Sequence, residues 1–161
     1  MNILQQSAFN IDLNLDPNWC NWFSGFVAGE GYFGSYISKR TKAVFVWLQI
    51  HLRDDDASIL YEIKETLKCG RIHNRKDRKR YGVPYHDQLN WECKDIGQCR
   101  FVLMPLFDKF PLRAKKKRDY EIWRKLTIAI SEGQHVNGNR DYVLDLCQQL
   151  KDIKKYIPPV L

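Results

Sequence analysis

Residues 23–31 read FSGFVAGEG, and this stretch decides the fold. Gly25 and Gly29 lie four residues apart, as do Ser24 and Ala28, and residues four apart share one face of a helix. That face is nearly bare backbone, although each glycine inside a helix costs roughly 1 kcal/mol relative to alanine. The small residues therefore need a packing reason, and they predict a helix that a second helix approaches very closely.

Glu30 is expected at the last position of this helix, where the helix dipole is negative. A carboxylate there is unfavourable for stability. A bound divalent cation would relieve the conflict, because hard cations take carboxylate oxygens as ligands. The alternative is an ordinary surface glutamate at a frayed helix end, and position alone does not separate the two interpretations.

The boundaries of this helix follow from its flanks. Asn18 is a fair N-cap, so we expect the helix to begin there and to run through Gly29. Gly31 is expected to end it, because glycine tolerates the left-handed conformation that helix C-termini often use. The polar residues 1–17 are predicted to form an N-terminal arm, and residues 18–161 a single domain.

A run of period two follows the helix, from Ala43 to Arg53. Its apolar side consists of Val44, Val46, Leu48, Ile50 and Leu52. Its other side consists of Phe45, Trp47, Gln49, His51 and Arg53. Such alternation predicts a half-buried strand with a polar, aromatic and basic open face. Residues 32–40 form the preceding strand, and a turn at 39–42 joins the two into a hairpin.

The remaining chain predicts a second hairpin among helices. Apolar residues at 59, 60, 63 and 67 indicate a helix capped by Asp56 and stopped by Gly70. The other expected elements are strands near 71–74 and 85–93, a helix from Asp95 to the Pro105–Pro111 region, and helices over 118–132 and 142–156. The order predicts an α+β fold, an antiparallel sheet with helices on one face.

Composition limits the class of protein. The 161 residues include 26 Lys and Arg against 19 Asp and Glu, and 44% are hydrophobic, which is enough for a core. No run approaches the roughly 18 apolar residues of a membrane span, so no membrane association is expected. Five cysteines without a CxxC pair favour reduced, buried thiols in an intracellular protein.

Positive charge is concentrated in two clusters. The first lies between Arg71 and Arg80, and the second between Arg113 and Arg118. Concentrated charge of this kind attracts a polyanion, chiefly through counterion release. The alternatives are a solvated face and an acidic membrane surface, although no basic amphipathic helix with an aromatic face is obvious.

The stretch 23–31 resembles the LAGLIDADG signature of homing endonucleases, with Phe23 at the first position and Glu30 as the final acid. The expected order of elements is similar to the family's αββαββα core over residues 18–132, whose sheet forms a saddle. The residues from Phe110 to Trp123 also resemble a later region of the family. Ala28 departs from the consensus, which has an acid there.

The resemblance implies metal-dependent hydrolysis of DNA phosphodiesters. It assigns Glu30, assisted by the carbonyl of Gly29, as ligand of Mg²⁺ or Mn²⁺. It implies a polar residue on the second strand that positions the attacking water, for which Gln49, His51 and Arg53 are the candidates. It also implies a lysine near the cleaved phosphate, either Lys115 or Lys117.

Family members with one motif pair two chains through their motif helices, so the resemblance implies a homodimer that makes a double-strand break in a roughly palindromic site. The interface would consist of Phe23, Ser24, Gly25, Ala28 and Gly29. The DNA-binding residues implied on the open face and its hairpins are Tyr32, Tyr36, Ser38, Arg40, Trp47, Gln49, His51, Arg53, His73, Arg75, Lys76, Arg78, Lys79, Arg80, His86, Gln88 and Asn90.

Three other functions fit the same sequence. The first is a maturase of this family, which would bind intron RNA. The second is a DNA-binding regulator on this fold without catalysis, and the third is an unrelated basic RNA-binding module. No targeting peptide is evident, which suits a cytoplasmic protein or one made inside a mitochondrion or chloroplast, and the resemblance to intron-encoded proteins favours the organelle.

Overall fold

The computed structural model describes residues 14–75 and 88–155. Its elements are α2 (Pro17–Glu30), β1 (Gly31–Ile37), β2 (Val44–Arg53), η1 (Asp54–Asp56), α3 (Ala57–Leu67), β3 (Arg71–Arg75), β4 (Gln88–Cys93), α4 (Ile96–Gln98), the π-helical turn η2 (Cys99–Leu103), α5 (Met104–Lys109), α6 (Ala114–Ser131) and α7 (Arg140–Asp152). This order confirms the predicted αββαββα arrangement, with α7 added at the end.

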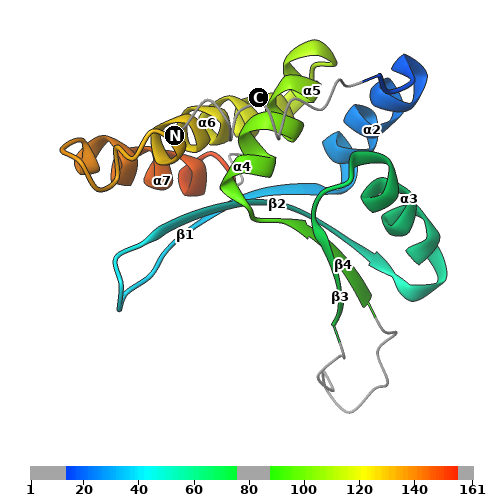
Figure 1. The fold of residues 1–161 in the computed structure, drawn as a ribbon, viewed down its shortest axis with the longest axis horizontal. Helices are drawn as coiled ribbons and strands as arrows, with labels where there is room; N and C mark the ends of the chain where they lie inside the picture. The colour runs from blue at the N-terminus through cyan, green and yellow to red at the C-terminus, as the bar shows by residue number, and fades with distance from the viewer. Residues whose placement is uncertain (1–13, 76–87, 156–161) are drawn as a thin grey trace, which may run out of the picture.

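The four strands form one antiparallel sheet in the order β1-β2-β4-β3. The described helices all lie on one side of this curved sheet, and the two hairpins point away from them (Figure 1). The predicted fold class, an antiparallel sheet with helices on one face, is therefore confirmed. No helix within the described ranges is long and apolar enough to cross a membrane.

The core lies between the sheet and the helices. The predicted inward side of β2 is confirmed, because Val44, Val46, Leu48 and Ile50 are all buried. Aromatic rings fill the centre: Phe33 lies 5.1 Å from Trp123 and 5.9 Å from Phe107 between ring centroids. Such rings bury large apolar areas, so they contribute much of the stability. The five cysteines are free and buried, as predicted.

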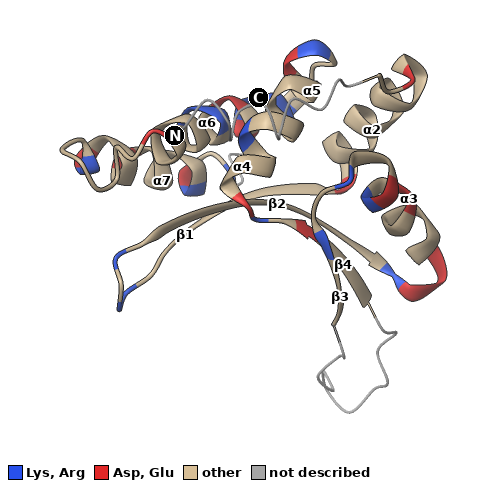
Figure 2. Cartoon of the chain, viewed as in Figure 1, with Lys and Arg blue, Asp and Glu red and all other residues tan. Residues whose placement is uncertain are grey.

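Residues 54–56 and the β1–β2 turn carry opposite charge. Asp54, Asp55 and Asp56 form an acidic patch after β2, while the turn carries Lys and Arg (Figure 2). Arg140, at the start of α7, donates to the carbonyl of Lys42 at 2.9 Å and to that of His135 at 3.1 Å. The turn is thereby attached to the helical layer at its base.

The start of α2 differs from the prediction. The helix begins one residue earlier, with Pro17 in its first turn, and Asp16 rather than Asn18 is the N-cap. The Asp16 carboxylate accepts from the backbone N–H of Asn18 at 3.0 Å. Proline suits this position, because its missing N–H would have no partner in the first turn of a helix. Asn18 therefore lies inside the helix, with its own N–H capped.

This difference gives the first testable prediction. Asp16→Ala should lower the free energy of unfolding by about 1 kcal/mol, because an N-terminal donor of α2 loses its acceptor. Asn18→Ala should leave stability nearly unchanged, since its side chain is exposed and does not cap. Urea denaturation of both variants checks the assignment, and a larger loss for Asn18→Ala would reverse it.

Candidate functional site

The motif helix α2 passes directly into β1 without a loop. The N–H of Gly31 still bonds to the carbonyl of Val27, yet its φ of −77° and ψ of 149° are those of a strand. The expectation of a left-handed Gly31 is therefore wrong. Glycine is needed for space, because a Cβ here would lie 2.6 Å from Cγ1 of Val27. The junction consequently fixes Glu30 relative to the sheet.

Glu30 and Gly29 lie at the exposed end of α2. The last carbonyls of a helix have no intrahelical partner, and together with a carboxylate they form the oxygen-rich environment that a hard divalent cation takes. Within the described ranges there is no group of three or more His, Cys, Asp or Glu side chains that could hold a metal. Glu30 therefore fits a Mg²⁺-type ion that keeps waters or binds further oxygens from a partner.

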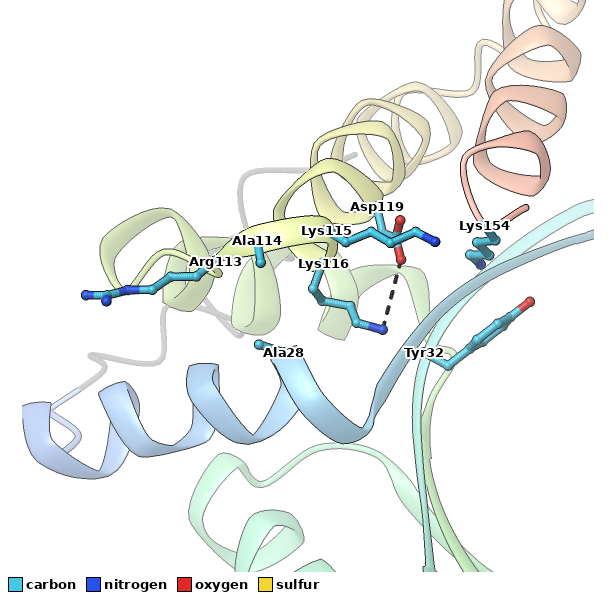
Figure 3. A pocket seen from close by; sticks show the side chains of 8 residues that line it. All are labelled: Ala28, Tyr32, Arg113, Ala114, Lys115, Lys116, Asp119 and Lys154. Atoms are coloured by element: carbon cyan, nitrogen blue, oxygen red, sulfur yellow. Dashed lines mark ion pairs between the residues drawn. The ribbon is translucent and has the colours of Figure 1, made fainter. Parts of the chain in front are cut away.

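A basic pocket opens beside this end of α2. We call it the basic pocket, and its lining residues are Ala28, Tyr32, Arg113, Ala114, Lys115, Lys116, Asp119 and Lys154. It has a volume of about 440 Å³ and brings together α2, β1, α6 and the segment after α7 (Figure 3). Four cationic side chains share it with one carboxylate, so the pocket attracts anions.

Lys116 is the most constrained cation of the basic pocket. Its side chain is only 18% exposed, and its Nζ donates to the carbonyl of Gly31 at 2.5 Å. Its Nζ also lies 4.0 Å from Oδ2 of the buried Asp119 (Figure 3). The Lys116 ammonium is thus held at the junction between α2 and β1, on the carbonyl of the residue that follows Glu30 in the sequence.

The two lysines predicted from the sequence differ in position. Lys115 lines the basic pocket, but Lys117 does not, and its Nζ lies 4.0 Å from the Glu121 carboxylate. Sequence reasoning missed Lys116 because it placed the start of this helix at Arg118. With α6 beginning at Ala114, the i, i+3 spacing of Lys116 and Asp119 would have indicated a pair on one helix face.

Contacts to the sheet and to α5 hold α6 in place. Trp123 donates its indole N–H to the carbonyl of Trp47 on β2 at 3.1 Å. Arg124 bonds both oxygens of Asp108 through Nε and Nη2, and Tyr120 donates to Asp108 at 2.7 Å. The Asp108 carboxyl is partly desolvated, but these donors outweigh the desolvation and lower its pKa, while burial raises the pKa of Tyr120. The middle of α6 is therefore held against β2 and α5.

The open face of the sheet carries most of the predicted DNA-binding side chains. Its centre is a hollow of about 310 Å³ lined by Gln49, His51, His73, Asn74, Asn90 and Glu92. Strand pairing explains the grouping, because Asn90 lies between His51 and His73 across three strands. Gln49 lies between Tyr32 and Glu92. The prediction missed Asn74 and Glu92, although the period-two pattern extended along β4 would have found Glu92.

Other predicted DNA-binding residues are exposed at the edges of this face. Tyr32 and Tyr36 are 43% and 52% exposed on β1, and Arg40 is exposed in the β1–β2 turn. Arg53 is paired with Asp55 at 2.6 Å, and the Ser38 hydroxyl accepts from the N–H of Thr41 at 3.2 Å. Gln88 is half-buried at the start of β4. Backbone pairing places Arg75 at the end of β3. The predicted residues Lys76, Arg78, Lys79, Arg80 and His86 lie outside the described residues.

Trp47 lies on the open face but is not free. Its indole ring covers Gly34 of the neighbouring strand, where a Cβ would come within 2.3 Å of the ring. Lys94 sits over the ring at 5.1 Å from its centroid. The indole N–H is buried in this conformation, so it is not presented to the open face, and a contact between Trp47 and DNA stays a prediction. The alternation assigned the correct face but did not give the direction of the ring.

The exposed side of α2 differs from the predicted chain–chain interface. Phe23 is fully buried in the core, and Ser24 is 5% exposed and donates to the carbonyl of Phe110 at 2.7 Å. Phe23 therefore has no surface to offer a second chain, whereas Ser24 lines the hollow beside Gly25 and its place in an interface stays a prediction. Gly25 and Gly29 are exposed, and a Cβ at either would meet nothing within 4 Å. Their surface also presents Asn21 and the 40% exposed Trp22, which the prediction missed.

The chain is similar in sequence to known endonucleases. The family model described as LAGLIDADG endonuclease matches residues 23–127. The chain is 26% identical over 149 residues to "Probable intron-encoded endonuclease 2" of Neurospora crassa, covering 91% of this chain and 29% of that protein.

Solved structures show the same fold. The LAGLIDADG homing endonuclease I-GzeII in complex with its DNA target aligns with a TM-score of 0.71 at 20% identity, over 88% of this chain and 47% of that one. The homing endonuclease I-TnaI aligns with a TM-score of 0.69 at 24% identity, over 86% and 95%. The chain thus spans under a third of its Neurospora relative and about half of I-GzeII. The match over residues 23–127 shows that the chain belongs to the LAGLIDADG endonuclease family.

Proposed function

We propose that this protein is a site-specific DNA endonuclease that hydrolyses phosphodiester bonds with Mg²⁺ or Mn²⁺ bound at Glu30 and the Gly29 carbonyl. The observation that carries the proposal is the meeting of three features at one place. The exposed acid ends α2, the basic pocket is lined by Ala28 two residues earlier and Tyr32 two residues later, and the polar face of the sheet starts at the next residues. Relatives of this family bound to DNA support the substrate class.

Each group of residues has a chemical role in this proposal. A divalent cation at Glu30 would stabilise the charge that develops on the phosphate and lower the pKa of a bound water. Lys116 and Lys115 neutralise the phosphate oxygens, acting as preorganised charges because Lys116 is already anchored. Gln49, in register with Tyr32, presents an amide near the junction and orients the attacking water. The open face supplies donors and acceptors to base edges in the major groove.

A double-strand break needs two such sites, so we propose a homodimer through the exposed side of α2. The supporting observation is that Gly25 and Gly29 leave room for close backbone approach. A hollow of about 530 Å³ beside them is lined by Asn21, Ser24, Gly25, Ala28, Pro111 and Arg113. Pairing would place two Glu30 carboxylates near each other and double the positive charge available to DNA.

The second candidate function is a maturase that binds intron RNA, and the open polar face would serve it equally. The relative named as intron-encoded supports a role tied to an intron in either case. Action inside an organelle stays a prediction.

The proposed function is tested with a DNA substrate in which the two sequences that flank the reading frame are joined directly, without the frame between them. Purified protein and Mg²⁺ should cut this joined sequence at one place on both strands. Binding to the transcript of the same region without cleavage of the DNA would favour the maturase, and binding to the DNA without cleavage in either metal would favour the regulator.

Glu30→Gln should abolish cleavage and keep DNA binding within a few-fold of the unchanged protein. The amide keeps the shape of the side chain but lacks the charge that attracts the cation. Stability should stay equal or rise slightly, because a negative charge leaves the C-terminus of α2. Nicking of supercoiled target plasmid in Mg²⁺ measures the effect, and undiminished nicking would remove Glu30 from the site.

Lys116→Met should reduce the single-turnover cleavage rate at saturating enzyme by on the order of 100-fold, since the variant lacks a preorganised charge beside the phosphate. Lys117→Met is the matched control, because it removes the same charge one residue away, outside the basic pocket. It should change the rate less than threefold. Equal reductions in the two variants would mean that net charge, rather than position, decides the rate.

Gly25→Leu should convert the dimer to a monomer, because the added side chain occupies the space that the second helix needs. Ser58→Leu, an exposed change on α3, is the control and should leave the dimer intact. Light scattering with sedimentation equilibrium gives the mass of each. A wild-type chain that is monomeric while fully active would contradict the homodimer.

A further inference from the structure

The first strand of the sheet has a free edge that two lysines cap. In the strand order β1-β2-β4-β3, β1 is at the edge, and among residues 14–75 and 88–155 it pairs only with β2. Lys116 donates to the Gly31 carbonyl, and Lys154, just after α7, donates to the Phe33 carbonyl. These two carbonyls are two residues apart on one strand, so they lie about 7 Å from each other. Two ammonium groups are thereby fixed side by side along this edge.

Lys154 belongs to the same basic pocket as Lys116. Its side chain is half-buried, and its Nζ lies 3.8 Å from the centroid of the Tyr32 ring, a cation–π contact (Figure 3). An ammonium has three N–H donors. One is used by the Phe33 carbonyl and one face is turned to Tyr32, which leaves donor capacity toward the pocket.

The electrostatics of the pocket call for an anion. Arg113, Lys115, Lys116 and Lys154 share it with the single carboxylate of Asp119. Burial and the neighbouring Lys116 ammonium lower the pKa of Lys154 to about 8, although Asp119 acts in the opposite direction. Lys116 is 18% exposed and Lys154 is half-buried, and two like charges held close together in partly desolvated surroundings are unfavourable until an anion enters. A structural seal of the strand edge would not require this accumulation.

We propose that Lys154 is a phosphate-binding residue that, together with Lys116, holds a backbone phosphate of DNA beside the end of α2. This inference rests on the proposed function and deepens it. It extends the site to a residue beyond 127, where the family match ends. The competing interpretation is that Lys154 only protects the free edge of β1, a common use of lysine on edge strands.

The salt dependence of DNA binding separates the two interpretations. Affinity for a random-sequence duplex is measured without divalent metal over a series of KCl concentrations. Lys154→Met should lower the slope of log K against log salt by about 0.9 for each phosphate that the side chain no longer neutralises. Lys154→Arg should keep the slope, because its charge remains.

Lys155→Met is the matched control. Lys155 is an exposed neighbour paired with Asp152 at 2.7 Å, and its substitution removes the same formal charge. It should change the slope by less than half as much. Thermal unfolding of all variants shows whether they fold. A slope for Lys154→Met that equals the wild type, or a fall that Lys155→Met reproduces, would overturn the inference.

The pH dependence of the same affinity is a second readout. Because its pKa is lowered, Lys154 is charged below about pH 8 and loses its proton as the pH rises through that value. Wild-type affinity should therefore fall through that window, and Lys154→Arg should flatten the fall, because arginine stays protonated. The groups that face Lys154 are Tyr32 on β1 and Lys115, Lys116 and Asp119 on α6, while Arg113 points away from it (Figure 3); all are unchanged in the variant.

The outcomes for the two proposals are distinguishable. If the wild-type protein binds no DNA under any of these conditions, the proposed function fails. If the wild type binds DNA with a steep salt dependence while Lys154→Met and Lys154→Arg behave like it in both salt and pH, only the role of Lys154 fails.

Discussion

The contact between Gly31 and Val27 fixes where everything else in this protein lies. Because α2 has no loop before β1, the direction of the helix sets the direction of the first strand. The absence of a Cβ at Gly31 lets the strand begin against the last turn of the helix. Lys116, on α6, then donates to the carbonyl of the buried Gly31. Glu30, the start of β1 and the Lys116 ammonium are thus all positioned by the backbone at Gly31.

This arrangement buries charged groups at the start of α6, and the surrounding structure holds them there although their burial is unfavourable. Asp119 is buried and faces the ammonium of Lys116, yet one of its oxygens has no hydrogen-bond partner. The Asp108–Arg124–Tyr120 network holds the same helix from its other side. Lys116, which is only 18% exposed and bonded to the Gly31 carbonyl, is thereby held in place, and this fixed charge preserves the attraction for an anion.

How far the sequence predicts this structure depends on the kind of information that each feature needs. The alternation over residues 43–53 identifies the inward face of β2, because period two follows directly from strand geometry. The i, i+4 small residues identify a bare helix face, but periodicity does not say which flank the core occupies. Phe23 is for this reason predicted at the surface, although it lies in the core.

The errors at the site have a similar origin. Helix boundaries are set by local dihedral angles, and Ala114 adopts a φ of 52° just where α6 begins. Nothing in the sequence marks that start, so the prediction misses Lys116. Trp47 shows that a strand pattern assigns a face but not a rotamer, because its ring can cover Gly34 only once β1 and β2 are paired.

The position of α7 has a consequence for the integrity of the sheet. Arg140 at its start holds the β1–β2 turn through Lys42, and Lys154 after its end holds Phe33. The two contacts therefore attach the β1–β2 turn and Phe33 of β1 to the helical layer, and the second occupies an edge carbonyl that would otherwise be available to another strand. A chain shortened before residue 140 would thus expose a template for strand pairing between molecules, so its first defect would be self-association rather than a simple loss of affinity for nucleic acid.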